Sequence, residues 1–199
     1  MKRHIKEEER MLYAGEELED IAGTYSGLCL VIGCGKTMWE DYAKAKELAP
    51  GCGDKMLVNM SIAIIQEEVQ HLFSMHYRLM TSYQMIRRAW MPDDKAIVHS
   101  TREWAGVEKA WELQPYCSTS GLAGAQLALL LGYDKVILCG VPHDGQSHYY
   151  DIYKNPGHGD RDRSREVGQC TRWQNNQIKS FSGKTKEILG EPTIEWLRG

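Results

Sequence analysis

The chain has 199 residues and carries 27 Asp and Glu against 24 Lys and Arg, which gives a formal net charge of −3 with neutral histidines. With 42% hydrophobic and 26% charged residues, it has the composition of one folded domain, and a chain of this length buries about 70% of the surface that it exposes when unfolded. This balance excludes a mainly disordered protein, and the absence of a long basic stretch argues against nonspecific nucleic-acid binding. Small ligands are the better expectation.

The ends of the sequence show neither an export signal nor a membrane span. The start, MKRHIKEEER, is charged throughout, and no apolar run approaches the ~20 residues that cross a bilayer. We therefore expect a cytoplasmic protein. No C-x-x-C pair occurs, which excludes a zinc ribbon and a thioredoxin-type motif. We expect free thiols. The six cysteines are Cys29, Cys34, Cys52, Cys117, Cys139 and Cys170.

Without an internal repeat or a low-complexity linker, residues 1–199 are interpreted as one domain. Residues 2–21 have the apolar spacing of an amphipathic helix. This helix could pack on its own domain or on a second copy, so a homo-oligomer stays open.

Strand and helix patterns alternate along the rest of the chain. The apolar run 28–32 is typical of a strand buried on both faces. Alternation of this kind predicts an α/β, Rossmann-like three-layer fold with a mainly parallel central sheet. Strands are expected at 28–32, 56–59, 71–74, 96–99 and 135–139, and helices at 38–48, 62–69, 77–90 and 120–131.

Ligands bind to such sheets at the carboxyl ends of the strands, and residues 33–37 (GCGKT) follow the first strand. A P-loop is excluded because Leu30 occupies its first glycine position, and a dinucleotide fingerprint is excluded because Met38 replaces its third glycine. What remains is a glycine turn leading into a helix, whose first amides suit a phosphate. The alternative is a turn needed only for packing. The predicted phosphate or nucleotide contacts are Gly33, Gly35, Lys36 and Thr37.

Residues 119–121 (TSG) open the helix expected at 120–131. Ser and Thr are the preferred N-cap residues, so their presence has a structural explanation. Their hydroxyl groups could equally hold a carboxylate, a phosphate or a ribose. We therefore keep Thr119, Ser120 and Gly121 as candidate ligand contacts.

The loop 142–151 follows the strand 135–139 and holds two His, two Asp and two Tyr. Such groups serve in general acid–base catalysis, and His titrates near neutral pH. His143, Asp144 and His148 are the candidate catalytic residues, although a solvated loop position explains each histidine as well. Their spacing matches no specific metal motif, so no metal ligand is assigned. Elsewhere, we expect His71 to be structural.

Taken in order, these motifs resemble the bacterial sialyltransferase-like family. The likeness rests on the glycine turn, on Asn59 closing the second strand, and on TSG leading through residues 127–140 (LALLLGYDKVILCG). A related domain with MptE-like pterin diphosphokinases is also similar. The sequence departs from the family pattern where Pro142 replaces the strand-end Asp and where GKT replaces GPS in the first turn.

The resemblance implies that Gly33, Gly35 and Asn59 bind a nucleotide and that Thr119, Ser120 and Gly121 complete its pocket. It also places Tyr150 against the nucleotide phosphate. We therefore expect a protein that binds a nucleotide or nucleotide-sugar, as a small sialyltransferase-like glycosyltransferase that requires no cofactor.

In such a transferase, His143 or His148 would be the base. One alternative is an MptE-like diphosphokinase, in which Asp144 and Asp151 would hold Mg²⁺. The other is a catalytically silent nucleotide-binding protein.

Overall fold

The computed structural model describes residues 21–51, 53–113, 117, 119–145, 148–149, 167–168 and 176–199. The predicted helix at 2–21 lies outside these residues except for its last position, and so do Tyr150 and Asp151.

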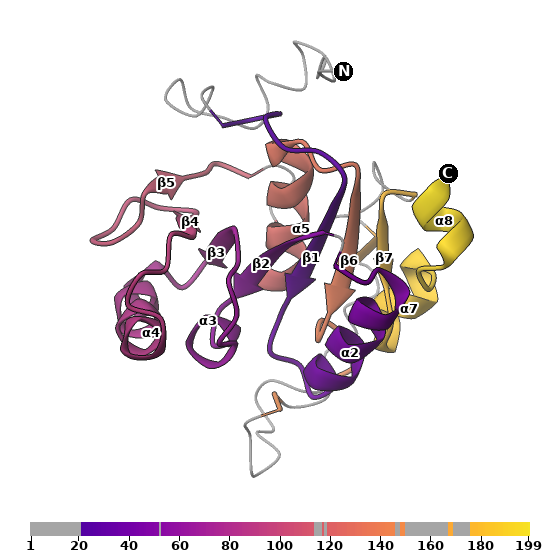
Figure 1. Cartoon of the computed structure of the whole chain (residues 1–199), viewed down its shortest axis with the longest axis horizontal. Coiled ribbons are helices and arrows are strands. Elements are labelled where there is room, and N and C mark those ends of the chain that lie inside the picture. The colour runs from indigo at the N-terminus through magenta and orange to yellow at the C-terminus, as the bar shows by residue number, and fades with distance from the viewer. Residues whose placement is uncertain are drawn as a thin grey trace.

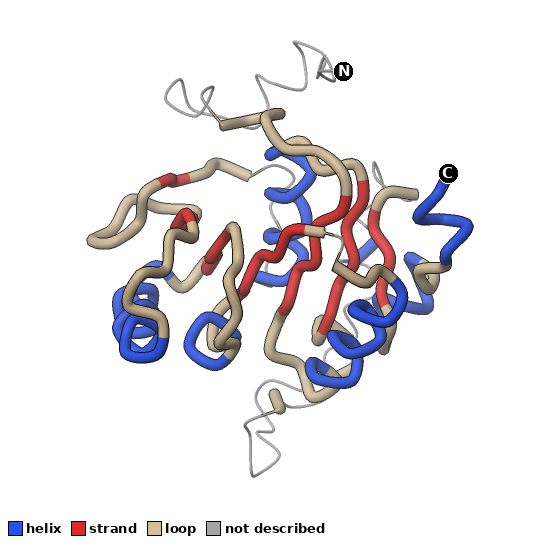
Figure 2. Tube along the Cα trace, in the orientation of Figure 1, coloured by secondary structure: helices blue, strands red, loops and turns tan. Residues whose placement is uncertain are grey.

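The described residues form a sheet of seven parallel strands in the order β5-β4-β3-β2-β1-β6-β7 (Figures 1 and 2). The predicted α/β, Rossmann-like class is therefore confirmed, with every described pairing parallel. The strands are β1 (Leu28–Ile32), β2 (Asp54–Val58), β3 (His71–Ser74), β4 (Ile97–Ser100), β5 (Lys109–Ala110), β6 (Lys135–Cys139) and β7 (Ile178–Ser180).

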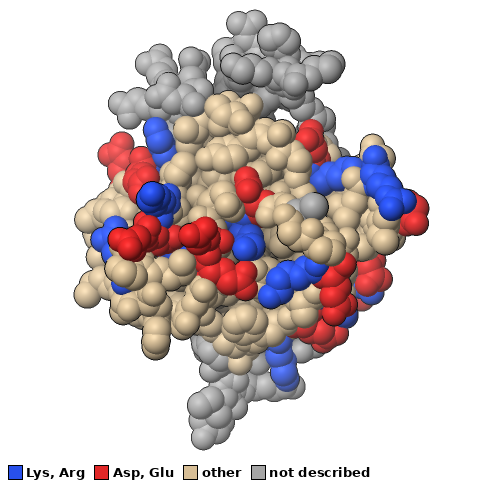
Figure 3. Space-filling view, viewed as in Figure 1, with Lys and Arg blue, Asp and Glu red and all other residues tan. Residues whose placement is uncertain are grey.

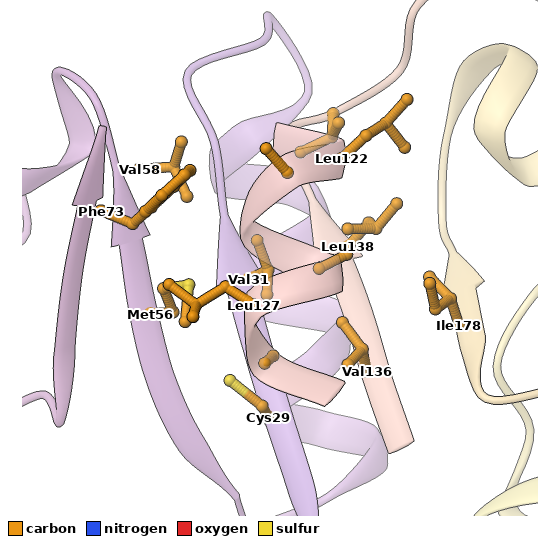
Figure 4. Packing of buried hydrophobic residues seen from close by; sticks show 14 of the residues in the cluster. Cys29, Val31, Met56, Val58, Phe73, Leu122, Leu127, Val136, Leu138 and Ile178 are labelled. Atoms are coloured by element: carbon orange, nitrogen blue, oxygen red, sulfur yellow. The ribbon is translucent and has the colours of Figure 1, made fainter. Parts of the chain in front are cut away.

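Helices cover both faces of the sheet. Successive residues of a strand point to opposite faces, and in the central strands the side chains on both faces are apolar. In β1, Cys29 and Val31 pack in the core beneath α5 (Figure 4), whereas Leu30 and Ile32 pack on the side of α2, α3 and α4. The helices are α2 (Met38–Leu48), α3 (Ser61–Ile64), α4 (Tyr77–Trp90), α5 (Ser120–Leu131), α7 (Gly183–Leu189) and α8 (Ile194–Arg198).

The helix predicted at 62–69 is wrong beyond its first turn, because α3 ends at Ile64 and Ile65 is extended. The buried Arg87 guanidinium explains the change. It donates to the carbonyl of Ile65 at 2.6 Å and to that of Glu67 at 2.8 Å, and it pairs with Asp94 at 2.6 Å. These carbonyls satisfy a buried cation only because the chain leaves the helix.

The order of the strands places a topological switch point between β1 and β6. The chain runs from β1 outward to β5 and returns through α5 to β6, on the other side of β1. Ligand crevices of open parallel sheets form at such a point, outside the carboxyl ends of the strands. The loops after β1 and β6 are thus where the fold favours a site.

The prediction of free thiols is confirmed in part. Cys29, Cys34 and Cys139 are free and buried, and burial raises the pKa of the Cys34 thiol to about 11. Cys117 is disulfide-bonded, so the expectation of a free thiol is wrong there. Because disulfides are more usual outside the reducing cytosol, the cytoplasmic location stays a prediction.

Two further properties bear on possible partners. Within the part of the chain that the structure describes, no helix has the length and apolar character needed to cross a bilayer. On the face seen in Figure 3, Lys and Arg side chains are interspersed with Asp and Glu. That face therefore carries no extended basic patch of the kind that binds nucleic acid.

Candidate functional site

The glycine turn after β1 lies directly against the loop after β6. The Gly33 amide donates to the Cys139 carbonyl and the Gly35 amide to the Gly140 carbonyl, each at 2.8 Å. A Cβ added to Gly33 would lie 2.7 Å from the Gly140 oxygen, and one added to Gly35 would lie 2.5 Å from Pro142 Cδ. Close packing therefore explains both glycines, and both amides already have protein acceptors.

Thr37 is the N-cap residue of α2 but makes no capping hydrogen bond with its side chain. Its hydroxyl lies 2.8 Å from both Asp41 Oδ2 and Ser182 Oγ. Asp41, only 1% exposed, also accepts from the Ser182 hydroxyl at 2.6 Å and from the Gly140 amide at 2.9 Å. Thr37 thus links α2 to the neighbouring loops. Lys36, the other predicted contact with a side chain in this turn, is exposed to solvent.

Asn59 follows β2 in the left-handed conformation, with φ of 60°. Its side-chain oxygen accepts from the Ser74 hydroxyl at 2.6 Å, and Ser74 Oγ accepts from the His76 amide at 3.0 Å. A left-handed residue other than glycine costs free energy, and such residues are concentrated at functional sites. The ends of β2 and β3 are therefore joined through a residue predicted to bind a ligand.

His143 follows β6 and is also left-handed, with φ of 50°. Its Nε2 lies 3.1 Å from Thr119 Oγ1, although 24 residues separate the two. Thr119 makes no side-chain cap to α5, and Ser120 Oγ accepts from the Met75 amide at 3.4 Å. The start of α5 is thus connected to β6 on one side and to β3 on the other.

Asn59 and His143 are the two described non-glycine residues with positive φ. Both stand at carboxyl ends of the sheet, and both were singled out by their sequence positions. Together with Thr119 and Ser120, they form a cluster of side chains from three distant parts of the chain.

The loop after β6 turns back to the glycine turn. His148 forms an antiparallel bridge with Gly35, and the Tyr149 amide donates to the Cys34 carbonyl at 3.0 Å. The Tyr149 ring lies edge-on to Trp39, and burial raises the pKa of its phenol to about 12. His148 is therefore close to the predicted turn, while Asp144 is half-buried just beyond His143.

A cavity of about 540 Å³ lies beside this cluster, at the carboxyl ends of β3 and β4. Ser120 lines it, along with His76, Tyr77, Arg102 and Glu112, which were not among the predicted site residues. The Arg102 guanidinium lies 5.7 Å from the centre of the Tyr77 ring. The rule that ligands bind where parallel strands end could have found these four residues, because His76 and Tyr77 follow β3, Arg102 follows β4 and Glu112 follows β5.

Among the described residues, no three His, Cys, Asp or Glu side chains gather in a group that could hold a metal ion. In the alternative prediction of a diphosphokinase, Asp144 and Asp151 would hold Mg²⁺. Asp151 lies outside the described residues, so this pair stays a prediction.

No protein-family model matches the chain, and no curated protein is similar to it. Solved structures do match it. The sialyltransferase CstII from Campylobacter jejuni in complex with cytidine-5'-monophosphate is 14% identical, with a TM-score of 0.58 over 84% of this chain and 86% of that one. Its complex with CMP-3FNeuAc gives 14% identity and a TM-score of 0.58 over 84% of this chain and 87% of that one.

A third structure, sialyltransferase CST-II with a trisaccharide acceptor and CMP, is 13% identical, with a TM-score of 0.57 over 84% of this chain and 87% of that one. The likeness to the MptE-like domain stays a prediction. At these identities, the similarity establishes that the chain has the fold of this sialyltransferase.

Proposed function

We propose that this protein binds a nucleotide or nucleotide-sugar at the carboxyl edge of its sheet, as a sialyltransferase-like glycosyltransferase. One observation carries the proposal: Asn59 and His143, the two described non-glycine residues with positive φ, follow β2 and β6 at the carboxyl edge of the sheet, and His143 contacts Thr119 at the start of α5. The shared fold supports it, because similar structures were solved with CMP.

The phosphate of the nucleotide would lie where positive potential is available. The start of α5 directs backbone amides and the positive end of a helix dipole toward the edge of the sheet. Lys36 would add a cation, and Tyr150 would add a hydroxyl donor. The Gly33 and Gly35 amides already donate hydrogen bonds to the carbonyls of Cys139 and Gly140. We therefore assign the phosphate to the start of α5, Lys36 and Tyr150 instead of these two amides.

The sugar would lie toward the cavity, where Ser120 borders both regions. In the transfer step, the acceptor hydroxyl oxygen forms a bond to the anomeric carbon while the bond from that carbon to the nucleotide phosphate oxygen breaks. The electron pair leaves with the nucleotide, and the hydroxyl proton passes to His143 or His148 as general base. The departing phosphate gains a second negative charge when this bond breaks, and the groups that bind the phosphate stabilise that charge.

Calorimetric titration with CMP tests the binding site. Asn59→Gly removes the amide but retains a residue that adopts positive φ readily, so a loss of affinity would report the side chain. Lys36→Ala should weaken binding about tenfold or less, as expected for an exposed charge. Lys95→Ala is its matched control, because Lys95 is exposed before β4 at the opposite edge of the sheet. Equal CMP affinity in all three variants would reject the site.

Turnover of a CMP-sugar tests the base. His143→Asn tolerates the left-handed backbone and retains hydrogen-bonding groups, but it takes up no proton near neutral pH. A loss of 10²–10⁴-fold in kcat with unchanged CMP affinity would identify the base. His148→Asn is measured beside it, and activity unaffected by both substitutions would exclude either histidine from that role.

A further inference from the structure

The cavity of about 540 Å³ beside the candidate site has buried apolar walls and an exposed polar rim. Trp111 and Leu113 line it at 1% and 5% exposure, whereas Arg102 and Glu112 line it as exposed residues. Its volume falls within the range of about 300–1,000 Å³ that is usual for small-molecule sites, which combine apolar walls with a few polar groups. The cavity is therefore large enough for a ligand of its own.

The indole of Trp111 gives this cavity a preformed wall. Its N–H donates to His99 Nδ1 at 3.0 Å, and the Trp111 amide donates to the Ser100 carbonyl at 2.8 Å. His99 is itself buried and lies 3.0 Å from His71 of the neighbouring strand. A ligand that packs on the indole thus loses little of its binding free energy in ordering the wall.

Positive charge is concentrated at one side of the rim. The Arg102 guanidinium lies over the Tyr77 ring, 5.7 Å from its centre, and the Arg78 guanidinium lies 5.6 Å from the centre of the same ring. Neither arginine takes part in the ion pairs of the described residues. A guanidinium over an aromatic face still has its N–H donors available for a carboxylate or a phosphate. This side of the cavity therefore suits an anionic group.

Glu112 restricts the kind of anion that fits. It also lines the cavity, and it is absent from the described ion pairs. A carboxylate repels a bare anion but accepts hydrogen bonds from hydroxyl groups. A cavity with both Arg102 and Glu112 thus favours a ligand that carries an acidic group together with hydroxyl groups.

The order of the strands shows how far this position lies from the proposed nucleotide. The nucleotide crevice is between β1 and β6, Ser120 contacts the Met75 amide after β3, Arg102 follows β4 and Glu112 follows β5 (Figure 1). Neighbouring strands lie about 4.8 Å apart, so the three steps from β1 to β4 span about 14 Å. A ligand at Arg102 would therefore lie beyond a sugar placed at Ser120, where an acceptor would bind.

We infer that the cavity binds the acceptor, and that Arg102 selects an acceptor with a carboxylate or a phosphate among its hydroxyl groups. The acceptor role rests on the proposed transferase function. Binding of an acidic, hydroxylated ligand at Arg102 does not, because it needs no nucleotide.

Titration of the full-length protein followed by NMR tests the inference with methyl β-D-glucuronide, glucose 6-phosphate and the neutral methyl β-D-glucoside. At least one of the two acidic sugars should bind about tenfold more tightly than the neutral one. The tighter of the two distinguishes a carboxylate from a phosphate.

Arg102→Gln should remove this preference and leave the melting temperature unchanged, because Arg102 is exposed. Arg102→Lys retains the charge without the planar fork of donors, so its preference should be intermediate. Arg198→Gln is the matched control, since Arg198 is exposed at the end of α8, beyond the opposite edge of the sheet. It should keep the full preference.

Equal affinities of the native protein for the three sugars, or no binding of any of them, would overturn the inference. A preference that survives Arg102→Gln would do the same. Titration with CMP separates this result from the proposed function. CMP binding without the preference rejects the acidic acceptor alone, whereas an Arg102-dependent preference without CMP binding supports the anion site and rejects the transferase.

Discussion

At the scale of single residues, two buried histidines form a directed chain of hydrogen bonds. Trp111 donates its indole N–H to His99 Nδ1 at 3.0 Å, so neutral His99 carries its proton on Nε2, 3.0 Å from His71 Nδ1. His71 then donates from Nε2 to the Tyr133 oxygen at 2.9 Å, and Tyr133 donates to Asp54 at 2.6 Å. The expected structural role of His71 thus has a physical basis.

An added proton would leave two donors facing each other in this chain, so we predict acid-sensitive stability. Burial lowers the pKa of His71 to about 4 and that of His99 to about 3. Because unfolded histidine takes up its proton near pH 6.5, the unfolded state binds more protons below that pH. The free energy of unfolding should have its full value above about pH 6.5. It should fall toward pH 4, by about 1.4 kcal/mol per pH unit for each histidine.

Urea unfolding measured between pH 5 and 8 checks this prediction. The double variant His71→Asn/His99→Asn should start from a lower stability and lose the part of the slope that these two protons contribute. The same slope in the variant and the native protein would contradict the assignment of the slope to the buried pair.

Asn59 offers a second test at the residue scale. Asn59→Ala and Asn59→Gly both remove the hydrogen bond from Ser74, but alanine disfavours the φ of 60° that glycine accepts. The alanine variant should be less stable than the glycine variant by about 1 kcal/mol in chemical denaturation. Equal stabilities would mean that the backbone at this position relaxes when the amide is removed.

At the scale of elements, the packing of α5 on β6 depends on a small residue at the first turn of the helix. A Cβ added to Gly121 would lie 2.6 Å from one γ-methyl of Val141 and 2.9 Å from the other. Val141 is 5% exposed and has little room to move. Gly121 therefore sets how closely α5 approaches the loop that holds His143.

We predict that Gly121→Ala destabilises the protein by about 1–3 kcal/mol, as overpacking of a core does. Val141→Ala should lose stability by itself. The double variant should lose less stability than the sum of the two single losses, because truncation of the valine removes the clash. Guanidinium unfolding of the three variants measures this coupling. Strictly additive losses would show that the two residues do not limit each other's packing.

At the scale of the whole molecule, ligand binding at the proposed site should stabilise the fold. A nucleotide at 100 times its Kd raises the free energy of unfolding by about 2.7 kcal/mol. Thermal unfolding with CMP, CDP, UDP, GDP, ATP and NAD, each with and without Mg²⁺, should show a shift for a cytidine nucleotide that does not depend on the metal. Stabilisation by ATP only with Mg²⁺ would favour the diphosphokinase, and no shift at all would contradict nucleotide binding.

Much of the fold was predictable because its signals are local. The apolar run 28–32 forms β1, and the small, apolar stretch 120–131 forms α5, which ends at Gly132 in the left-handed conformation that glycine adopts easily. The end of α3 was not predictable, since it depends on Arg87, more than twenty residues away. The short strands β5 and β7 were also missed, because two or three residues carry too little pattern.

By itself, the sequence determined the order of the central strands and helices along the chain, and with it the sheet edge where the candidate residues end their strands. Which of these residues meet was decided by the tertiary structure. Strand order brings Thr119 to His143 and Ser74 to Asn59, and it leaves the cavity beside Tyr77 and Arg102. Contacts of this kind depend on which strands are neighbours, and strand neighbours are chosen by packing over the whole core rather than by local pattern.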